Sequence, residues 1–402
     1  MSIRKERISS GTPFLPQDRY NEKDYDFVFR KPRRSRAHLA GWIVSAVLGF
    51  TLLYTFIPSR ILRISRHSSV KVTAVTSNEY EHRVTTTQSS GKIWPSIPHF
   101  TNMFVFGDSF SETYFDLFGP LPSEANSLGN SNNTKPIWVD YLTSQYLKSP
   151  PRIYSLARGG SVIDSQLVKN TFGTSLTHQI HADFLPLYAS SSPTVHWDSS
   201  NTLFTIWLGI NDMVLAADAS LRAPLDAIFA SYRASLETLY DAGARNFLLM
   251  NVPPIHHVYE MKYDTKPLKS DIHWFNKHLL QLRQDFMRAH SADPEPITTA
   301  LYFDVHELWT QVIVVPQSFP QTRQLKETKK YCLAYLLDET PGDGEDVYDE
   351  SCKGRLSEYF WQNLHVTAKV HEVTAAILAD DCLGGGGGGG AELGRRPKGY
   401  CS

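Results

Sequence analysis

The chain has 402 residues, of which 42% are hydrophobic and 12% aromatic, and its formal net charge is -1 at pH 7. This apolar content is enough to bury one large core of the size found in single α/β domains. The balanced charge gives no basic excess of the kind that binds nucleic acid, so we expect no nucleic-acid partner.

The most apolar stretch of the chain runs from Leu39 to Ile57, with no charged residue in 19 positions. A segment of this length can cross a membrane as a helix, and we interpret residues 37–58 as a transmembrane signal anchor, with a cleaved signal peptide as the alternative. Seven Lys and Arg residues lie within twenty positions before the segment and four within twenty after it. This bias predicts a single-pass type II membrane protein whose catalytic domain faces the secretory lumen or the extracellular space.

The segments around this anchor have the composition of unfolded chain. Residues 1–36 are polar and basic and predict a disordered cytoplasmic tail, while residues 59–95, rich in Ser, Thr and charge, predict an extended stem. Residues 383–402 include an unbroken glycine run from Gly384 to Gly390 and predict a flexible tail. A folded domain is therefore expected over residues 96–382. An error in the gene's assembly is an alternative explanation for the first hundred residues and for the glycine run.

Four cysteines and one glycosylation sequon agree with an oxidising compartment. Cys332 and Cys352 flank a polar loop rich in Gly and Asp, so we expect a disulfide between them. Cys382 and Cys401 are then the remaining pair, although four cysteines permit three pairings. Asn132 begins the sequon Asn-Asn-Thr in a polar loop and is a candidate N-glycosylation site.

Within residues 96–382, short apolar runs alternate with helical patterns. The apolar runs predict strands at Met103–Phe106, Arg152–Ala157, Leu203–Leu208, Phe247–Val252 and Ala300–Val305. The helical pattern is clearest at Pro224–Ala242, Lys269–Ala292 and His365–Asp380. Strands that alternate with helices form parallel sheets through right-handed crossovers. The predicted fold is therefore a three-layer α/β/α sandwich around a parallel sheet of about five strands.

Ser109 is the candidate nucleophile. The apolar run Met103–Phe106 is broken by Gly107 and Asp108, which leaves the serine at the carboxyl end of a strand. In open α/β sheets this is the edge where ligands bind. A polar turn capped by Asp108 or Ser109 is the alternative when this stretch is taken alone.

Chemical partners for such a serine occur near the ends of other predicted elements. Gly160, in the pair Gly159-Gly160, lets a backbone N–H approach a substrate, Asn211 offers a carboxamide donor, and His365 precedes the last helix as a candidate base. Taken singly, these residues have ordinary explanations: a tight turn, a helix cap and a partly buried polar residue. Their joint occurrence in the order Ser, Gly, Asn, His favours a hydrolytic site.

These blocks resemble the signature of the GDSL or SGNH hydrolases. The matching stretches are GDSF at Gly107–Phe110, ARGGS at Ala157–Ser161, GIND at Gly209–Asp212, and His365. Two further stretches, Gly243–Pro254 and Tyr359–His371, resemble the fungal acetylesterases grouped as carbohydrate esterase family 16. The resemblance covers most of residues 101–380 and implies the flavodoxin-like SGNH-hydrolase fold.

The resemblance also implies a role for each residue. Ser109 would be the nucleophile and His365 the general base. The backbone N–H groups of Ser109 and Gly160, with the side chain of Asn211, would form the oxyanion hole. The family implies no metal and no organic cofactor.

The chain departs from the family pattern beside the histidine. The family usually has Asp three residues before it, where this chain has Gln362, and often Pro directly after it, where this chain has Val366. An amide oxygen can accept the Nδ1–H bond but brings no negative charge to stabilise the imidazolium, so lower activity is expected. The alternatives are a Ser–His dyad or an acid from the nearest upstream carboxylates, which are Asp349, Glu350 and Glu358.

Three functions follow from these observations. The leading expectation is a serine esterase that hydrolyses carboxylic esters through an acyl-enzyme, deacetylating carbohydrate or small acetyl esters. The anchor and stem suggest a lumenal glycan O-acyltransferase as an alternative. The substitutions at Gln362 and Val366 suggest a catalytically impaired binding module as another.

Overall fold

The computed structural model describes residues 100–384, except for 134, 172, 190–192, 260–264, 293–297 and 333–347, together with residues 399–402. These residues belong to one compact unit, Gly91–Ser402. The expected cytoplasmic tail, transmembrane anchor and stem lie outside the described residues. Within the described part of the chain, no helix combines the length and the apolar character needed to span a membrane.

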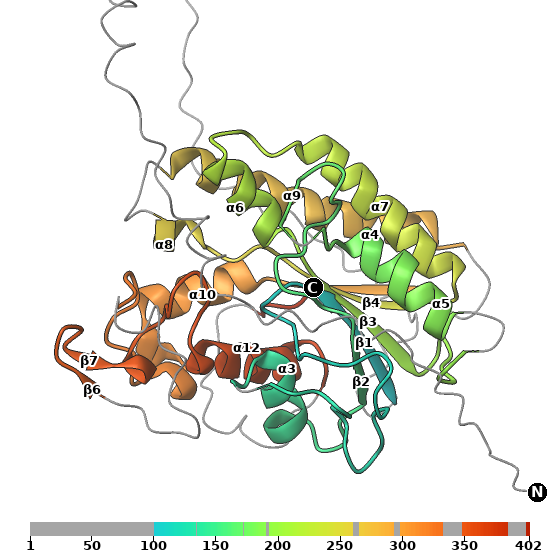
Figure 1. The fold of residues 1–402 in the computed structure, drawn as a ribbon, viewed down its shortest axis with the longest axis horizontal. Coiled ribbons are helices and arrows are strands. Elements are labelled where there is room, and N and C mark those ends of the chain that lie inside the picture. The colour runs from blue at the N-terminus through green and yellow to red at the C-terminus, as the bar shows by residue number, and fades with distance from the viewer. Residues whose placement is uncertain are drawn as a thin grey trace, which may run out of the picture. The chain divides into compact units, whose positions relative to one another are not determined.

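A five-stranded parallel sheet lies at the centre of this unit (Figure 1), with the strand order β2-β1-β3-β4-β5. The strands are β1 (Asn102–Gly107), β2 (Arg152–Ser155), β3 (Thr202–Trp207), β4 (Asn246–Met250) and β5 (Thr299–Phe303). Every residue of β1, β3 and β4 is buried, as expected for a parallel sheet covered on both faces. The expectation of about five parallel strands is therefore confirmed.

Four of the five predicted strands extend one or two residues too far at their carboxyl ends. The reason is that apolar burial continues past the last paired residue: Leu156, Leu208, Val252 and Val305 are all fully buried after β2, β3, β4 and β5. Burial alone therefore does not reveal where the ladder of hydrogen bonds ends.

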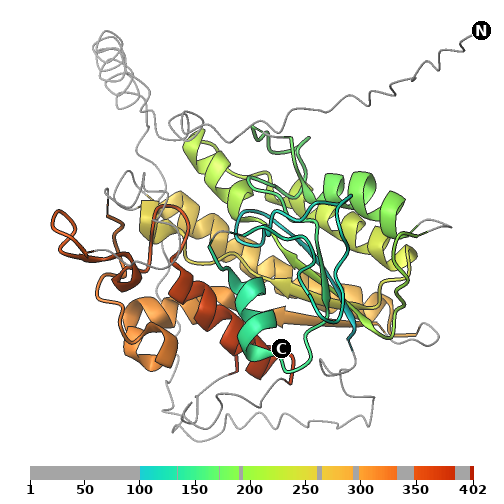
Figure 2. The ribbon, with the colours of Figure 1, turned by 60° about the horizontal axis from the view of Figure 1, so that its bottom comes forward.

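Helices cover both faces of the sheet, which confirms the three layers (Figures 1 and 2). One layer contains α6 (Ile210–Asp218), α7 (Leu225–Asp241) and α9 (Lys266–Ala289), with the short helices α4 (Leu176–His178) and α5 (Leu185–Tyr188) joined by the π-helical turn η4 (Gln179–Phe184). The other contains α3 (Trp138–Tyr141), α10 (Val305–Val314) and α12 (Ala368–Asp381). The smaller elements are α8 (His256–Tyr259), η3 (Leu142–Tyr146), η5 (Pro316–Ser318), η6 (Pro320–Thr322), η7 (Leu356–Glu358), β6 (Tyr348–Asp349) and β7 (Gly354–Arg355).

The last helix begins later than expected. The helical pattern was predicted from His365, but α12 starts at Ala368, with Thr367 as its N-cap residue. Trp361 and Val366 instead pair as an antiparallel bridge, so His365 lies in a tight hairpin before the helix. The apolar period could not show this hairpin, because its turn is only four residues long.

Aromatic side chains fill the core on both sides of β1 and β3. Phe104 stacks on Phe204 at 5.3 Å and meets the edge of Phe184 at 5.1 Å on the η4 side. On the α10 side, Trp207 and Trp309 lie 5.8 Å apart, and each lies against Phe110. Rings of this size lose little entropy when they are packed, so the second cluster is a rigid base for the turn that follows β1.

Both disulfides that were expected are present, Cys332–Cys352 and Cys382–Cys401. The end of the chain differs from the flexible tail predicted for residues 383–402. Tyr302 and Ser402 exchange backbone hydrogen bonds of 2.9 and 3.0 Å, and the Asp304 N–H donates to the carbonyl of Tyr400 at 2.8 Å. The last residues therefore pair with the outer edge of β5, an edge strand that has free backbone groups to offer, and the second disulfide holds them near it.

Candidate active site

Ser109 lies in the turn that directly follows β1. The buried side chain of Asp108 shapes this turn, because its Oδ1 accepts the Phe110 N–H at 3.0 Å. Ser109 itself is partly exposed, and its Oγ is 2.7 Å from Nε2 of His365. The structure thus brings the expected nucleophile and the expected base into hydrogen-bond contact across 256 positions of sequence.

The imidazole of His365 is held on a packed aromatic surface. Its ring lies 5.2 Å from that of Phe110, which itself rests on the Trp207 and Trp309 cluster. Loss of water around the ring lowers the pKa of His365 to about 4, and the positive charge of Lys135 acts in the same direction. The imidazole is therefore neutral at pH 7, which is the form that a general base requires.

The side chain that contacts Nδ1 of His365, on the side of the ring away from Ser109, is not the residue expected. Nδ1 of His365 is 2.9 Å from Oδ1 of Asn363, so the position predicted for Gln362 is filled by its neighbour. Within the hairpin, the backbone N–H of Gln362 donates to the carbonyl of His365 at 3.0 Å. The short side chain of Asn363 reaches the backbone two residues ahead, as in an Asx turn, and this places its amide beside the ring.

The upstream carboxylates considered as substitutes are engaged elsewhere. Glu358 accepts from Lys326 Nζ at 2.7 Å and from the Arg355 N–H at 3.0 Å. Asp349 accepts from the Cys352 N–H at 3.2 Å. In the described part of the chain neither these two acids nor Glu350 forms a hydrogen bond with His365, so the structure does not support the alternative of an acid from these three residues.

Two backbone N–H groups are available in the segments that follow β1 and β2. Gly160 has a φ of +72°, a conformation that favours glycine, in the loop after β2. The N–H of the preceding Gly159 is occupied by Glu112 Oε2 at 3.0 Å. Among the residues that the structure describes, no acceptor takes the N–H of Gly160 or that of Ser109. These are the two backbone donors expected for an oxyanion hole.

Asn211 connects the two loops that carry these donors. It lies in the first turn of α6, and Gly209 is the N-cap residue, so the explanation of Asn211 as a helix cap is wrong. Its Nδ2 donates to Ser161 O at 3.0 Å and to Asp108 Oδ2 at 3.2 Å. Both amide hydrogens are thus engaged, one by the loop after β2 and one by the turn after β1.

A family model of the GDSL-like lipase/acylhydrolases matches residues 103–378, which include Ser109, Gly160, Asn211 and His365. The chain belongs to this family. An acetylesterase from Thermothelomyces thermophilus is 34% identical over 174 residues, 41% of this chain and 57% of that protein. A thermolabile hemolysin from Vibrio parahaemolyticus is 26% identical over 185 residues, 45% of this chain and 39% of that protein.

The matches therefore span less than two thirds of the length of either relative. Among solved structures, an acetylxylan esterase from Geobacillus stearothermophilus is similar with a TM-score of 0.41 and 14% identity, over 69% of this chain and 92% of that one.

Sequence reasoning missed a buried glutamine that holds this GDSL site together. Gln179, in η4, donates from Nε2 to Gly107 O at 2.7 Å and to Ser161 Oγ at 3.0 Å, and its Oε1 accepts the Gly107 N–H at 3.1 Å. It thereby joins the end of β1 to the loop of Gly160. Its position among the buried residues Leu176, Ile180 and Phe184 was the available signal, because a polar side chain on an apolar face must find partners.

Two buried carboxyl groups also link the segments that carry the site residues. Burial raises the pKa of Asp108 and of Asp212 to about 7. Both oxygens of Asp212 lie 3.2 Å from the N–H of Ile163, so this side chain ties α6 to the loop that carries Gly160. Asp108 connects the turn of Ser109 to Asn211. Together the two acids thus link the turn after β1, the loop after β2 and the first turn of α6.

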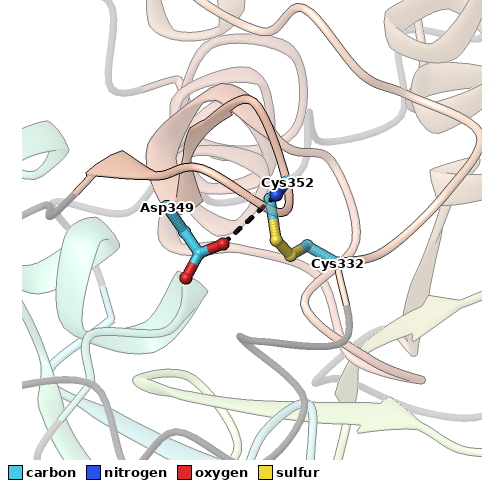
Figure 3. A group of neighbouring side chains, drawn as sticks. All are labelled: Cys332, Asp349 and Cys352. Carbon is cyan, nitrogen blue, oxygen red and sulfur yellow. Dashed lines mark hydrogen bonds between the residues drawn. A yellow bond between two sulfur atoms is a disulfide. The ribbon is translucent and has the colours of Figure 1, made fainter.

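One group of potential metal ligands occurs among the described residues, away from this site. Cys332, Asp349 and Cys352 place their ligand atoms within 4.8 Å of one another. Figure 3 shows that the two sulfur atoms are joined and that Asp349 faces the backbone of Cys352. A disulfide offers no thiolate, which is the form of cysteine that binds metals. The role of this group is therefore to crosslink the chain between Cys332 and Cys352.

Proposed function

We propose that this GDSL protein is a serine esterase that hydrolyses carboxylic esters through an acyl-enzyme. The observation that carries the proposal is the 2.7 Å contact between Ser109 Oγ and His365 Nε2. It is supported by the neutral state of the imidazole and by the available backbone N–H groups of Ser109 and Gly160. Family membership agrees with this chemistry.

The steps use groups of the chain alone. His365 Nε2 takes the proton of Ser109 as Oγ attacks the ester carbonyl, and the new oxyanion accepts hydrogen bonds from the N–H groups of Ser109 and Gly160. The imidazolium then gives its proton to the departing alcohol, which leaves the acyl group on Ser109. Water, deprotonated by the same imidazole, attacks this acyl-enzyme. The imidazolium then gives the proton back to Ser109 Oγ as the acid is released, which restores the free serine and the neutral histidine.

The substrate class that we propose is an acetyl ester of a carbohydrate or of a small alcohol. The support is the 34% identity to an acetylesterase. Glycan O-acyl transfer differs only in the second step, in which a sugar hydroxyl would take the place of water.

The test compares the full-length chain with Ser109→Ala on 4-nitrophenyl acetate, with the exposed Ser123→Ala as a matched control. Loss of the nucleophile should lower kcat by about 10⁴-fold or more, whereas the control should match the original protein. Equal rates for Ser109→Ala and the original chain would overturn the proposal. A fluorophosphonate that fails to label Ser109 would instead indicate a binding module, and faster acetyl transfer to an added sugar than to water would indicate an acyltransferase.

We further propose that the catalytic unit works on the lumenal or extracellular side of a membrane, anchored through Leu39–Ile57. The two disulfides support an oxidising compartment. In intact cells, the unit should resist added protease when it is lumenal or be cleaved when it is extracellular, and Asn132→Gln should remove a glycosidase-sensitive mass. A chain that fractionates with cytosol and whose mass does not change in the Asn132→Gln variant would contradict this localisation.

A further inference from the structure

We infer that Asn363 is the positioning residue that makes His365 a competent base, and that it does so as a neutral amide. The inference rests on the proposed esterase function and deepens it. The family pattern pointed to position 362, and the amide beside the ring belongs to position 363.

A neutral amide beside a catalytic histidine presents a difficulty that a carboxylate does not. A carboxylate only accepts, so it always selects the imidazole that carries its proton on Nδ1. An amide can turn its NH₂ group toward Nδ1, which would select the opposite tautomer, with the proton on Nε2. A histidine in that state cannot take the proton of the serine, and this is the reason that Asp→Asn substitutions in Ser-His-Asp triads are so damaging.

The backbone of His365 removes this ambiguity. The same Asn363 atom that lies 2.9 Å from Nδ1 also lies 2.8 Å from the backbone N–H of His365. A backbone N–H can only donate, so the atom that faces it must be the amide oxygen. Nδ1 must then carry the proton and donate to this oxygen. Nε2 is left with its lone pair, 2.7 Å from Ser109 Oγ, as a general base requires.

The arrangement is built within one hairpin. The carbonyl of His365 accepts the N–H groups of Gln362 and Asn363 at 3.0 and 3.4 Å, and Trp361 pairs with Val366 across the base of the hairpin. The amide, the backbone N–H that orients it and the imidazole that it orients are therefore all within three consecutive residues. No acid from another part of the fold is needed to choose the tautomer.

The missing negative charge has a measurable consequence. Lys135, from the loop before α3, lowers the pKa of His365, and His365 in turn acts on His371 of α12, whose own pKa is lowered mainly by burial. Neither neighbour offers a negative charge that would stabilise an imidazolium. Asn363→Asp keeps an acceptor for both hydrogen bonds and adds the charge. It should shift the acid limb of kcat/KM for 4-nitrophenyl acetate upward by about one pH unit or more, because a nearby carboxylate favours the protonated ring. At pH 8 its kcat should rise by about 10-fold, because the imidazolium formed in the transition state is stabilised.

Removal of the amide tests the positioning directly. Asn363→Ala should lower kcat by about 100-fold with KM changed less than about threefold, because the ring loses its orientation and the substrate contacts remain. The matched control is Gln362→Ala, which alters the neighbouring amide and should keep kcat within about threefold. If Gln362→Ala is as damaging as Asn363→Ala, or if Asn363→Asp leaves the pH profile unmoved, the inference is wrong.

A spectroscopic measurement separates this inference from the proposed function. In the full-length chain labelled with ¹⁵N-histidine, the His365 signals are identified by their loss in His365→Gln. They should show protonated Nδ1 and unprotonated Nε2 in the original protein and a mixture of tautomers in Asn363→Ala. Protonated Nε2 in the original protein would overturn the inference whether or not the chain is active. If the chain shows this tautomer and yet hydrolyses no ester, the proposed function alone fails.

Discussion

Gly209 is the position where the site depends most directly on the absence of a side chain. It is the N-cap residue of α6, two positions before Asn211, and its φ is +112°. A Cβ at this position would lie 2.5 Å from Cζ of Phe275 and 2.9 Å from each Cε atom. Because Phe275 is fully buried and packs at 4.9 Å against Phe229, its ring cannot move aside without disturbing the core.

Gly209→Ala should therefore lower the free energy of unfolding by about 2–4 kcal/mol. A left-handed backbone costs an alanine about 1–2 kcal/mol, and overpacking a core costs about 1–3 kcal/mol. The smaller entropy of the unfolded alanine chain offsets about 0.4–1 kcal/mol of this. With a urea slope of about 3 kcal/mol/M, the unfolding midpoint should fall by about 1 M. Esterase activity at low urea should also fall, because the first turn of α6 carries Asn211.

The matched control is Gly243→Ala. Its φ of +107° is nearly the same, yet its Cβ would meet only Trp197, at an ordinary 3.5 Å. The control therefore includes the backbone cost without the clash, and it should lower the midpoint by about half as much or less. Equal midpoints for the two variants, measured by urea unfolding with tryptophan fluorescence, would refute the assignment of the larger loss to the contact with Phe275.

Two further predictions concern pH and the end of the chain. Burial raises the pKa of Asp212 to about 7, so its contribution to stability is complete below about pH 4 and is lost as the pH rises through 7. Asp212→Asn lacks this loss. As the pH rises from 5 to 8, the unfolding midpoint of the variant should therefore increase relative to that of the original chain. A constant difference between the two midpoints across this range would contradict the reasoning. Cys401→Ser opens a crosslink that spans 19 positions, which should cost about 3 kcal/mol. The Tyr302 amide, which donates to Ser402, should then exchange its hydrogen faster, and unchanged protection would show that β5 holds the end of the chain by itself.

The strands and the nucleophile could be predicted from sequence because their signals are local. A parallel strand buried on both faces is a continuous apolar run, and the break at Gly107 marks the strand end where Ser109 stands. The four family blocks then indicated Gly160, Asn211 and His365 by their order alone. Both disulfides were also expected, because Cys332 and Cys352 flank one polar loop and leave Cys382 and Cys401 as the remaining pair.

The details that govern the chemistry depend on contacts that no local pattern carries. Whether position 362 or 363 faces the imidazole is decided by a hairpin, and neighbouring amides look equivalent until their directions are known. The pairing of Tyr400–Ser402 with β5 could not be predicted from the sequence either. The glycine run before these residues predicts a flexible segment and gives no information about which strand the residues after it will contact. The sequence by itself thus determined the fold class and the pair of Ser109 and His365, which the structure brings into contact. Only the tertiary structure decided which group orients that base, because hydrogen bonds depend on direction as well as on proximity.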